Sequence, residues 1–461
     1  MASIALQSGE RSTVWSDPEG RILAVGMGEA ARVEASGEGR FRSLQTRLES
    51  WTSRVLAHEE LRELPLWFGG FSFRGADPRE VHQDPTWGAW AQDTFVTHEI
   101  TSVKTTEGTW TVLSLRVRPS DSAAAVLAEY ERLMSIVETM RRLAASSALL
   151  QSQEEVALHF SDDQSRARWS QTVDAAQEEI RGGALEKVVL ARRILAPWPQ
   201  SAGHQAVPAR IHSALQALRT RYAHCTTFAL SLPSAEANES AAFDARSQQT
   251  FFGATPELLI ARAGERIHTM ALAGTAPRGA SADEDRAHEY ALLGSEKERE
   301  EHRLVVEAIV QALGTLNVEV RPSSVPDVVS FPNVHHLRTS IHAAAPAHAG
   351  VLELAEALHP TPAVCGAPGP VAFRWLQENE PWERGWYAGG VGWLNDRMDG
   401  RISVALRSAL ANAEGVCAFA GAGIVEGSDA DREWDETRAK LAPIRDAFAP
   451  PSAPETSSPR A

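Results

Sequence analysis

One helix constrains the fold of this chain more than any other stretch, because its apolar face continues into acidic side chains. The helix begins at Ser295, and the apolar residues that share one face at helical spacing are Val305, Ala308, Ile309 and Ala312. Counting back along this face by one and two turns reaches Glu301 and Glu298. Carboxylates on a buried face are costly unless a cation meets them. The fold must therefore bring positive charge to this helix.

A plainer interpretation of the same stretch is a solvated surface. Ser295 and Glu298 form a capping box, and acids in a first helical turn interact favourably with the helix dipole. A second helix near the C-terminus weighs against this, because Glu433, Glu436 and Lys440 share one of its faces. Mg²⁺ typically takes one or two carboxylates directly and keeps waters and substrate oxygens. We therefore expect the two helices to share a magnesium site.

Composition narrows the class of protein. The chain has 461 residues, of which 43% are hydrophobic and 23% charged, as in an ordinary globular protein. A net charge of −15 argues against a nucleic-acid partner. Neither a signal sequence nor a membrane span is indicated by the hydrophobic pattern. Three scattered cysteines suggest neither a disulfide framework nor a zinc site, so we expect a cytoplasmic protein.

The order of elements favours an α+β fold. Residues 1 to about 120 indicate short strands and turns, and residues 122 to about 150 indicate a helix. The pair Gly69-Gly70 predicts a bend or a close backbone approach within a sheet. Strands and helices alternate without a regular βαβ rhythm, which favours antiparallel sheets. The serines and prolines of residues 449–461 predict a disordered tail.

Two charged residues in the middle of the chain are candidates for chemistry. The two-residue period of a strand at residues 185–192 puts Lys187 on the same face as Val189, hence inward, although a lysine there is commonly an edge residue. Pro256 fixes the backbone at the start of a turn and so aims Glu257. A surface acid is the alternative for Glu257.

The C-terminal part indicates an anion site. Residues 402–410 and 416–420 predict a hairpin with Arg407 in its first strand, although a cross-strand surface pair is the plainer role for this arginine. The second strand runs into Gly421, Ala422 and Gly423, whose bare N–H groups could approach an anion.

Three other stretches are interpreted as structural. Residues 272–275 predict a strand that ends in a glycine turn, and residues 359–366 predict a loop made rigid by prolines. The adjacent His335 and His336 are too far in sequence from other ligand candidates to indicate a metal site.

Taken together, seven motifs in order resemble the chorismate-utilising enzymes, which include anthranilate, aminodeoxychorismate, salicylate and isochorismate synthases. The match spans roughly residues 165 to 445, and its motifs are Lys187–Arg192, Ala254–Leu259, Leu272–Thr275, Ser295–His302, His359–Gly366, Gly421–Ile424 and Arg432–Lys440. The resemblance implies one large unit, with antiparallel sheets packed centrally and helices outside. Residues 1–160 would complete the fold of a chorismate-binding core at 161–448.

The resemblance also implies roles for individual residues. Mg²⁺ would bridge a chorismate carboxylate to Glu301 and Glu436 directly, and to Glu298 and Glu433 through water. Lys187 would be the base and Glu257 the acid. Such roles require a lysine that is neutral and a glutamate that is protonated near pH 7, so both pKa values would have to be shifted. The residues implied to contact the substrate are Arg407, Gly421, Ala422, Gly423, Lys440, Thr275, Tyr387 and Ala363.

Two alanines distinguish among members of the family. Relatives that make anthranilate or salicylate carry threonine at the position of Ala363, and aminodeoxychorismate synthases carry a lysine nucleophile at that of Ala273. Isochorismate synthase activity is therefore the prediction, with another family enzyme or a non-catalytic chorismate-binding protein as alternatives. The product would feed menaquinone or siderophore synthesis, and the long N-terminal part favours menaquinone. The resemblance suggests a monomer.

Overall fold

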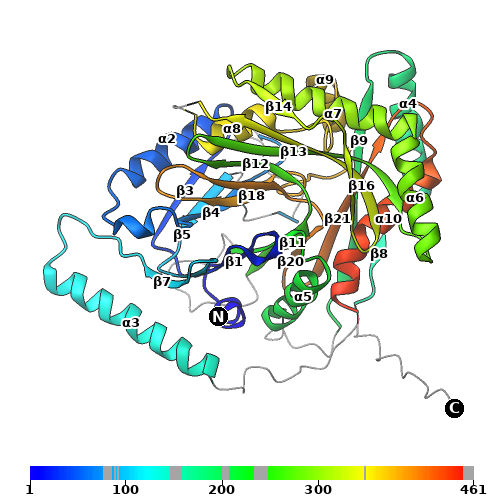
Figure 1. Ribbon diagram of the computed structural model, residues 1–461. Coiled ribbons are helices and arrows are strands. Elements are labelled where there is room, and N and C mark those ends of the chain that lie inside the picture. The colour runs from blue at the N-terminus through cyan, green and yellow to red at the C-terminus, as the bar shows by residue number, and fades with distance from the viewer. Residues whose placement is uncertain are drawn as a thin grey trace.

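Two antiparallel β-sheets pack against each other with helices around them (Figure 1). The computed structural model describes residues 1–75, 86–87, 90, 93–145, 158–162, 165–199, 207–232, 248–346 and 349–449. The predicted α+β class with central antiparallel sheets is confirmed. Most of the predicted C-terminal tail, from residue 450, lies outside the described residues.

The first sheet joins strands from both ends of the chain. In the described residues it has eleven strands, in the order β17-β9-β21-β20-β11-β10-β1-β2-β6-β7, with β8 paired to β9. Their bounds are β1 (Ser12–Ser16), β2 (Leu23–Met27), β6 (Ile100–Lys104), β7 (Thr109–Leu113), β8 (Ser161–Asp162), β9 (Lys187–Pro197), β10 (Thr226–Leu232), β11 (Gln249–Thr255), β17 (Gly366–Ala367), β20 (Ser408–Ala411) and β21 (Gly415–Ile424).

The second sheet also joins N-terminal strands with strands from later in the chain. Its ten strands, counted over the described ranges, follow the order β14-β16-β13-β12-β19-β18-β4-β5-β3, with β15 paired to β16. Their bounds are β3 (Ala31–Ala35), β4 (Trp67–Phe71), β5 (Asp93–Thr97), β12 (Leu258–Ala263), β13 (Arg266–Pro277), β14 (Val320–Pro322), β15 (Asp327–Ser330), β16 (Val334–Ala344), β18 (Gly390–Leu394) and β19 (Gly400–Val404). The N-terminal strands therefore extend both sheets.

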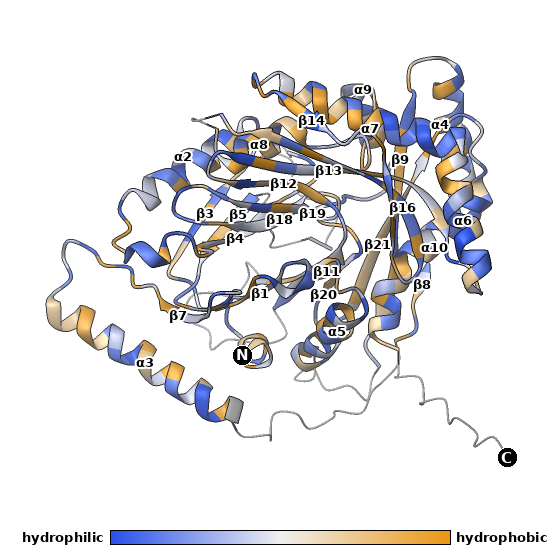
Figure 2. Cartoon of the chain, in the orientation of Figure 1, coloured by the Kyte–Doolittle hydropathy of each residue, from blue (hydrophilic) through white to orange (hydrophobic). Residues whose placement is uncertain are grey.

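Helices surround this pair of sheets. Helix α7 packs on β13, α8 on β12, α10 on β21 and α5 on β10. Hydrophobic residues concentrate on strands such as β9, whereas α4 and α6 at the margin are mainly hydrophilic (Figure 2). The bounds are α1 (Ala2–Gln7), α2 (Arg40–Thr52), α3 (Ala123–Ala145), α4 (Arg166–Arg181), α5 (Val207–Arg221), α6 (Ala282–Gly294), α7 (Glu296–Gly314), α8 (Val351–Leu358), α9 (Gly369–Asn379) and α10 (Ala430–Ala447).

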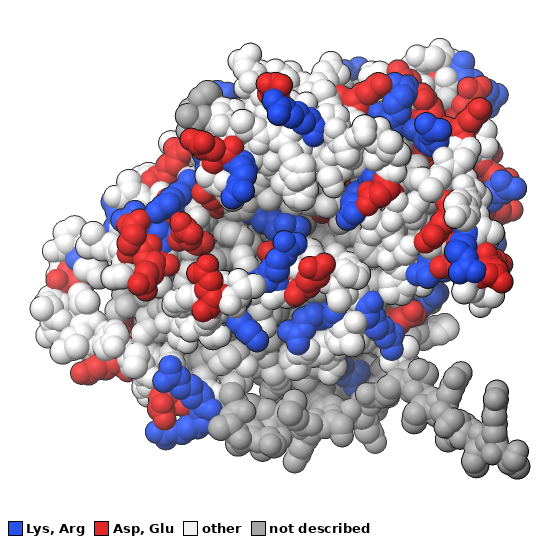
Figure 3. Space-filling view, in the orientation of Figure 1, with Lys and Arg blue, Asp and Glu red and all other residues white. Residues whose placement is uncertain are grey.

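Surface properties agree with an ordinary globular chain. Acidic and basic side chains are interspersed on the face shown in Figure 3. Among the described helices, none combines the length and the apolar character that crossing a membrane requires.

The close backbone approach predicted at Gly69-Gly70 is confirmed. Both glycines lie in β4, where a Cβ atom on Gly69 would lie 1.9 Å from the Thr94 carbonyl oxygen and one on Gly70 would lie 2.1 Å from that of Gly390. Neither position has room for a side chain. Large aromatic side chains fill the core around this strand, among them the fully buried Phe68 and Phe71.

The chain crosses between the two sheets twice at one place. It leaves the first sheet after β11 and enters the second at β12, so that Pro256 and Glu257 form the link. It returns between β19 and β20, where Arg407 has a positive φ of 48°. Backbone hydrogen bonding joins the two crossings, because the Val404 N–H donates to the Glu257 carbonyl at 3.0 Å.

Two predictions of local structure are wrong as a result of this topology. Residues 402–410 are not one strand, because the chain changes sheets between β19 and β20 and Arg407 lies in this crossing. The glycine turn at residues 272–275 is instead a bulge at Gly274 within β13, marked by a register shift between Ala273 and Thr275.

Candidate active site

A pocket opens where both crossings meet α7, α10 and the end of β21. Its empty volume is about 690 Å³, including the part that is open to solvent. The predicted site residues that line it are Glu257, Thr275, Glu301, Ala363, Tyr387, Arg407, Gly421, Gly423 and Lys440. Of the other predicted residues, three contact residues of the lining: Lys187, Glu298 and Glu436. The structure therefore brings together residues from widely separated motifs.

Lys187 points into the protein, as the strand pattern predicted. It is the first residue of β9, only 1% of its side chain is exposed, and its Nζ donates to Glu301 Oε1 at 2.8 Å. Burial opposes ionisation of Glu301, but Lys187 outweighs it together with Lys440 and Lys297, so that the pKa of Glu301 is lowered. A candidate base and a candidate metal ligand thus form one ion pair.

Glu257 meets the electrostatic requirement of an acid. It follows β11 at the crossing, and 5% of it is exposed. Burial raises its pKa to about 7, although Lys187, Lys440 and Arg407 act in the opposite direction. A carboxyl group with this pKa is protonated in about half of the molecules at neutral pH, as the prediction of an acid requires.

The remaining acids crowd around the ends of α7 and α10. Glu298 Oε2 accepts the Thr275 N–H at 2.8 Å, and Glu436 pairs with Lys440 at 2.6 Å. Burial, followed by repulsion from a neighbouring carboxylate, raises the pKa of both Glu298 and Glu433. Burial is the larger cause for both acids, and the repulsion shows that their neighbours are also carboxylates.

The residues present fit a hard cation. Two helices bring four carboxylates near one another, since Glu301 and Glu436 each raise the pKa of both Glu298 and Glu433. Such oxygens are a donor set suited to Mg²⁺. Gly423 keeps space open there, since a Cβ atom on it would lie 3.0 Å from Glu301 Oε1 and 2.9 Å from Lys187 Cε.

The glycine strand offers two backbone donors, fewer than predicted. Val189 and Ala191 direct their N–H groups away from β21, so the residues opposite them, Gly423 and Gly421, direct theirs away from β9. The pairing of β21 with β20 ends at Phe419, so these two N–H groups lie on an unpaired edge.

Ala422 does not share this orientation. It alternates with its neighbours and faces its N–H toward β9, and it does not line the pocket. The prediction that its N–H group contacts the anion is therefore wrong.

His336 lines the pocket, which its interpretation as a structural residue did not anticipate. Arg407 Nη2 donates to His336 Nε2 at 3.0 Å, and His336 Nδ1 lies 3.1 Å from the Gly274 carbonyl oxygen and from Thr275 Oγ1. Burial, followed by repulsion from Arg407, lowers the pKa of His336 well below its usual value. The neutral ring therefore holds the guanidinium in place. The contact joins β16 to the crossing between β19 and β20, which are far apart in the sequence.

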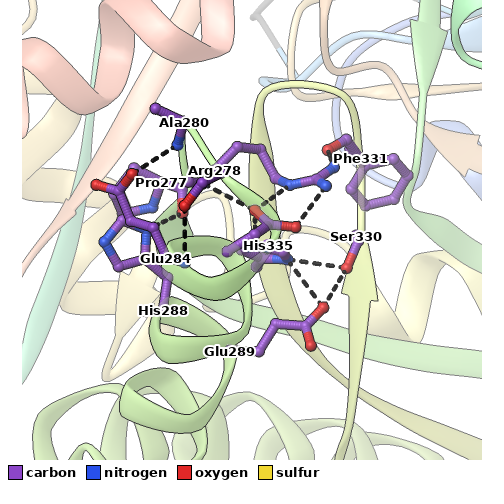
Figure 4. Close-up of polar contacts among 12 residues, drawn as sticks. Pro277, Arg278, Ala280, Glu284, His288, Glu289, Ser330, Phe331 and His335 are labelled. Atoms are coloured by element: carbon purple, nitrogen blue, oxygen red, sulfur yellow. Dashed lines mark hydrogen bonds and ion pairs between the residues drawn. The ribbon is translucent and has the colours of Figure 1, made fainter.

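His335 points elsewhere and is structural. Its Nε2 lies 3.0 Å from Asp285 Oδ1 and its Nδ1 lies 2.8 Å from Ser330 Oγ, which donates to Glu289 Oε1 at 3.0 Å (Figure 4). This group of Asp, Glu and His has metal-ligand types within reach of one another. However, Arg278 already binds both carboxylate oxygens of Asp285. The hydrogen bonds of the cluster connect α6 to the strands β15 and β16.

Sequence reasoning also missed Arg384, which holds the wall of the pocket. It is 2% exposed and donates to the carbonyl oxygens of Val364 at 2.7 Å and Val189 at 2.6 Å, and from Nε to Glu380 at 2.8 Å. These bonds fix the loop that carries Ala363 to β9. Its position within a charged stretch gave no signal of this role.

Comparison with known proteins identifies the family. The family model described as chorismate binding enzyme matches residues 2–449. The chain is 33% identical to the salicylate biosynthesis isochorismate synthase of Pseudomonas aeruginosa, over 94% of this chain and 84% of that protein. It is 30% identical to the isochorismate synthase MenF of Bacillus subtilis, over 93% of this chain and 86% of that protein.

A solved structure supports the fold. The menaquinone-specific isochorismate synthase MenF from Escherichia coli has a TM-score of 0.71 and 24% identity, and the match covers 97% of this chain and 91% of that one. The chain belongs to the chorismate binding enzyme family, as the motifs predicted.

The pKa of Glu257 predicts a pH-dependent stability. Ionising this buried carboxyl costs free energy only in the folded state, so the native protein loses stability as the pH rises from 4.5 to about 7. We expect Glu257→Gln to exceed the native protein in unfolding free energy by up to about 3 kcal/mol near pH 8 and to match it below pH 4.5. Chemical denaturation at both pH values measures this. Glu186→Gln, which changes an exposed acid, is the control, and an equal gain in both variants would contradict the prediction.

Proposed function

We propose that this protein is an isochorismate synthase, which converts chorismate reversibly to isochorismate with Mg²⁺. The observation that carries the proposal is a buried acid, Glu257, with a pKa near 7 in a pocket beside a buried lysine. The names of the two relatives support the same activity, and both align with this chain over most of their length. The names of the similar proteins include both a salicylate and a menaquinone route, so the proposal covers the activity and leaves the pathway open.

The proposed reaction moves a hydroxyl group between ring carbons. Lys187 must first release to solvent the proton through which it pairs with Glu301. As the free base, it then accepts a proton from a water molecule while the water oxygen bonds to carbon 2 of the ring. The double bonds shift, and the bond from carbon 4 to its hydroxyl breaks. Glu257 donates a proton to the departing hydroxyl, which leaves as water. One water enters and one leaves, so the substrate and the product are isomers.

The substrate is a dianion, and the pocket offers partners for both carboxylates. Bound Mg²⁺ would orient one carboxylate and balance its charge, held by Glu301 and Glu436 directly and by Glu298 and Glu433 through water. Arg407, fixed by His336, offers a planar fork to the other carboxylate, beside the N–H groups of Gly421 and Gly423. Lys440, Thr275 and Tyr387 complete the proposed contacts.

Replacing a proposed metal ligand tests the role of Mg²⁺. We expect Glu301→Gln and Glu436→Gln to abolish activity, because each removes a hard anionic ligand without a change in volume. EDTA should inhibit the native enzyme, and added Mg²⁺ should restore its activity. Glu300→Gln on the same helix is the control, since Glu300 is 58% exposed and pairs with Arg303. Full activity of either ligand variant at low magnesium would remove the metal assignment.

The proposed acid and base should affect turnover more than binding. We expect Lys187→Ala and Glu257→Gln to lower kcat by about 10²- to 10⁴-fold with a smaller change in KM, since proton transfer occurs in the transition state. Steady-state kinetics, with circular dichroism to verify folding, provides the measurement. A raised KM at unchanged kcat would make the residue a binding group.

Product analysis decides between isochorismate synthase and the alternatives. The side chain of Ala363 has no hydroxyl group that could orient isochorismate for the elimination of pyruvate. We therefore expect a mixture of chorismate and isochorismate without pyruvate. Chromatography identifies the products, and a coupled lactate dehydrogenase assay measures pyruvate. Stoichiometric pyruvate with fluorescent salicylate would favour a salicylate synthase, and unchanged chorismate would favour a binding protein.

A further inference from the structure

Lys297 brings a positive charge to the crowded carboxylates from the edge of the site. It is the second residue of α7, and its Nζ lies 3.6 Å from Glu433 Oε1 on α10 and 3.8 Å from Glu298 Oε1 on its own helix. The Lys297 side chain is 46% exposed, whereas that of Glu433 is 4% exposed. The lysine therefore reaches from solvent toward one buried acid, Glu433, and one partly buried acid, Glu298.

The other two lysines of this region are held differently. Lys187 donates to Glu301 at 2.8 Å with 1% of its side chain exposed. Lys440 pairs with Glu436 at 2.6 Å and also donates to the Gly421 carbonyl oxygen at 3.0 Å. The two distances from Lys297 are longer than hydrogen bonds, so charge attraction rather than fixed geometry holds it.

The long side chain and its partial exposure mean that Lys297 can leave. Its four-carbon stem can turn outward and place the ammonium in water, where solvation replaces the carboxylates. Lys187 has no such path because it is buried at the start of β9. Of these three lysines, Lys297 alone is therefore suited to exchange with another cation.

We propose that Lys297 is a displaceable internal counter-ion, which neutralises Glu298 and Glu433 in the metal-free protein and competes with Mg²⁺ for them. The inference rests on the metal site of the proposed function. It makes Lys297 a residue that weakens metal affinity and stabilises the empty site. A residue that serves only as a metal or substrate contact would neither weaken metal affinity nor stabilise the empty site.

Calorimetric titration of the full-length, metal-stripped protein with Mg²⁺ tests this. We expect Lys297→Met to bind Mg²⁺ about tenfold more tightly than the native protein, because a nearby positive charge is gone. Arg299→Met is the matched control, since it removes the same charge from the same helix at an exposed position about 200° around the axis. Arg299→Met should bind Mg²⁺ like the native protein, and Glu301→Gln should show that the titrated site is this one.

Thermal unfolding provides a second readout without turnover. In EDTA, Lys297→Met should unfold at a lower temperature than Arg299→Met, because its carboxylates repel each other without a counter-charge. Saturating Mg²⁺ should raise the unfolding temperature of Lys297→Met by more than that of Arg299→Met.

The outcomes separate this inference from the proposed function. If the native protein binds Mg²⁺ and Lys297→Met binds it equally or more weakly, the counter-ion role is overturned and the proposed function stands. If Arg299→Met gains as much affinity as Lys297→Met, the effect is one of overall charge and the inference also fails. If the native protein does not bind Mg²⁺, the metal part of the proposed function falls, and the inference with it.

Discussion

The ion pair between Lys187 and Glu301 is the interaction on which the site depends, because it joins the two sheets of the fold. Lys187 belongs to the first sheet, and Glu301 lies on α7, which packs on β13 of the second sheet. A lysine with 1% exposure and no anionic partner would be strongly destabilising. The pair therefore requires the sheets and α7 to be assembled together.

The other residues of the pocket also come from both sheets. Gly421, Gly423 and the α10 acids come from the side of the first sheet, whereas Thr275 and His336 come from the second. Glu257 and Arg407 lie in the crossings between the sheets. Strands from the first 113 residues extend both sheets, so this part of the chain stabilises the frame that holds the site.

Much of the fold class and most of the site were predictable from sequence, because the signals are local. The spacing of Glu298 and Glu301 on a helix face and the alternation around Lys187 are visible in a few residues. The crossing at Arg407, the bulge at Gly274 and the contacts of His336 and Arg384 were not predictable, since each depends on a partner far along the chain. The spacing of residues in the sequence also gave no reason to notice Lys297, because it meets Glu433 only where the first turns of α7 and α10 approach each other.

The double crossing has a consequence for how the interior tolerates change. Glu257 and Arg407 are tied to both sheets at once, so the spacing of the sheets sets where these two groups point. Phe68 points from β4 of the second sheet toward Thr13 and Leu230 of the first sheet. The size of this ring helps to set the distance between the sheets, so a side chain deep in the core affects where Glu257 and Arg407 point.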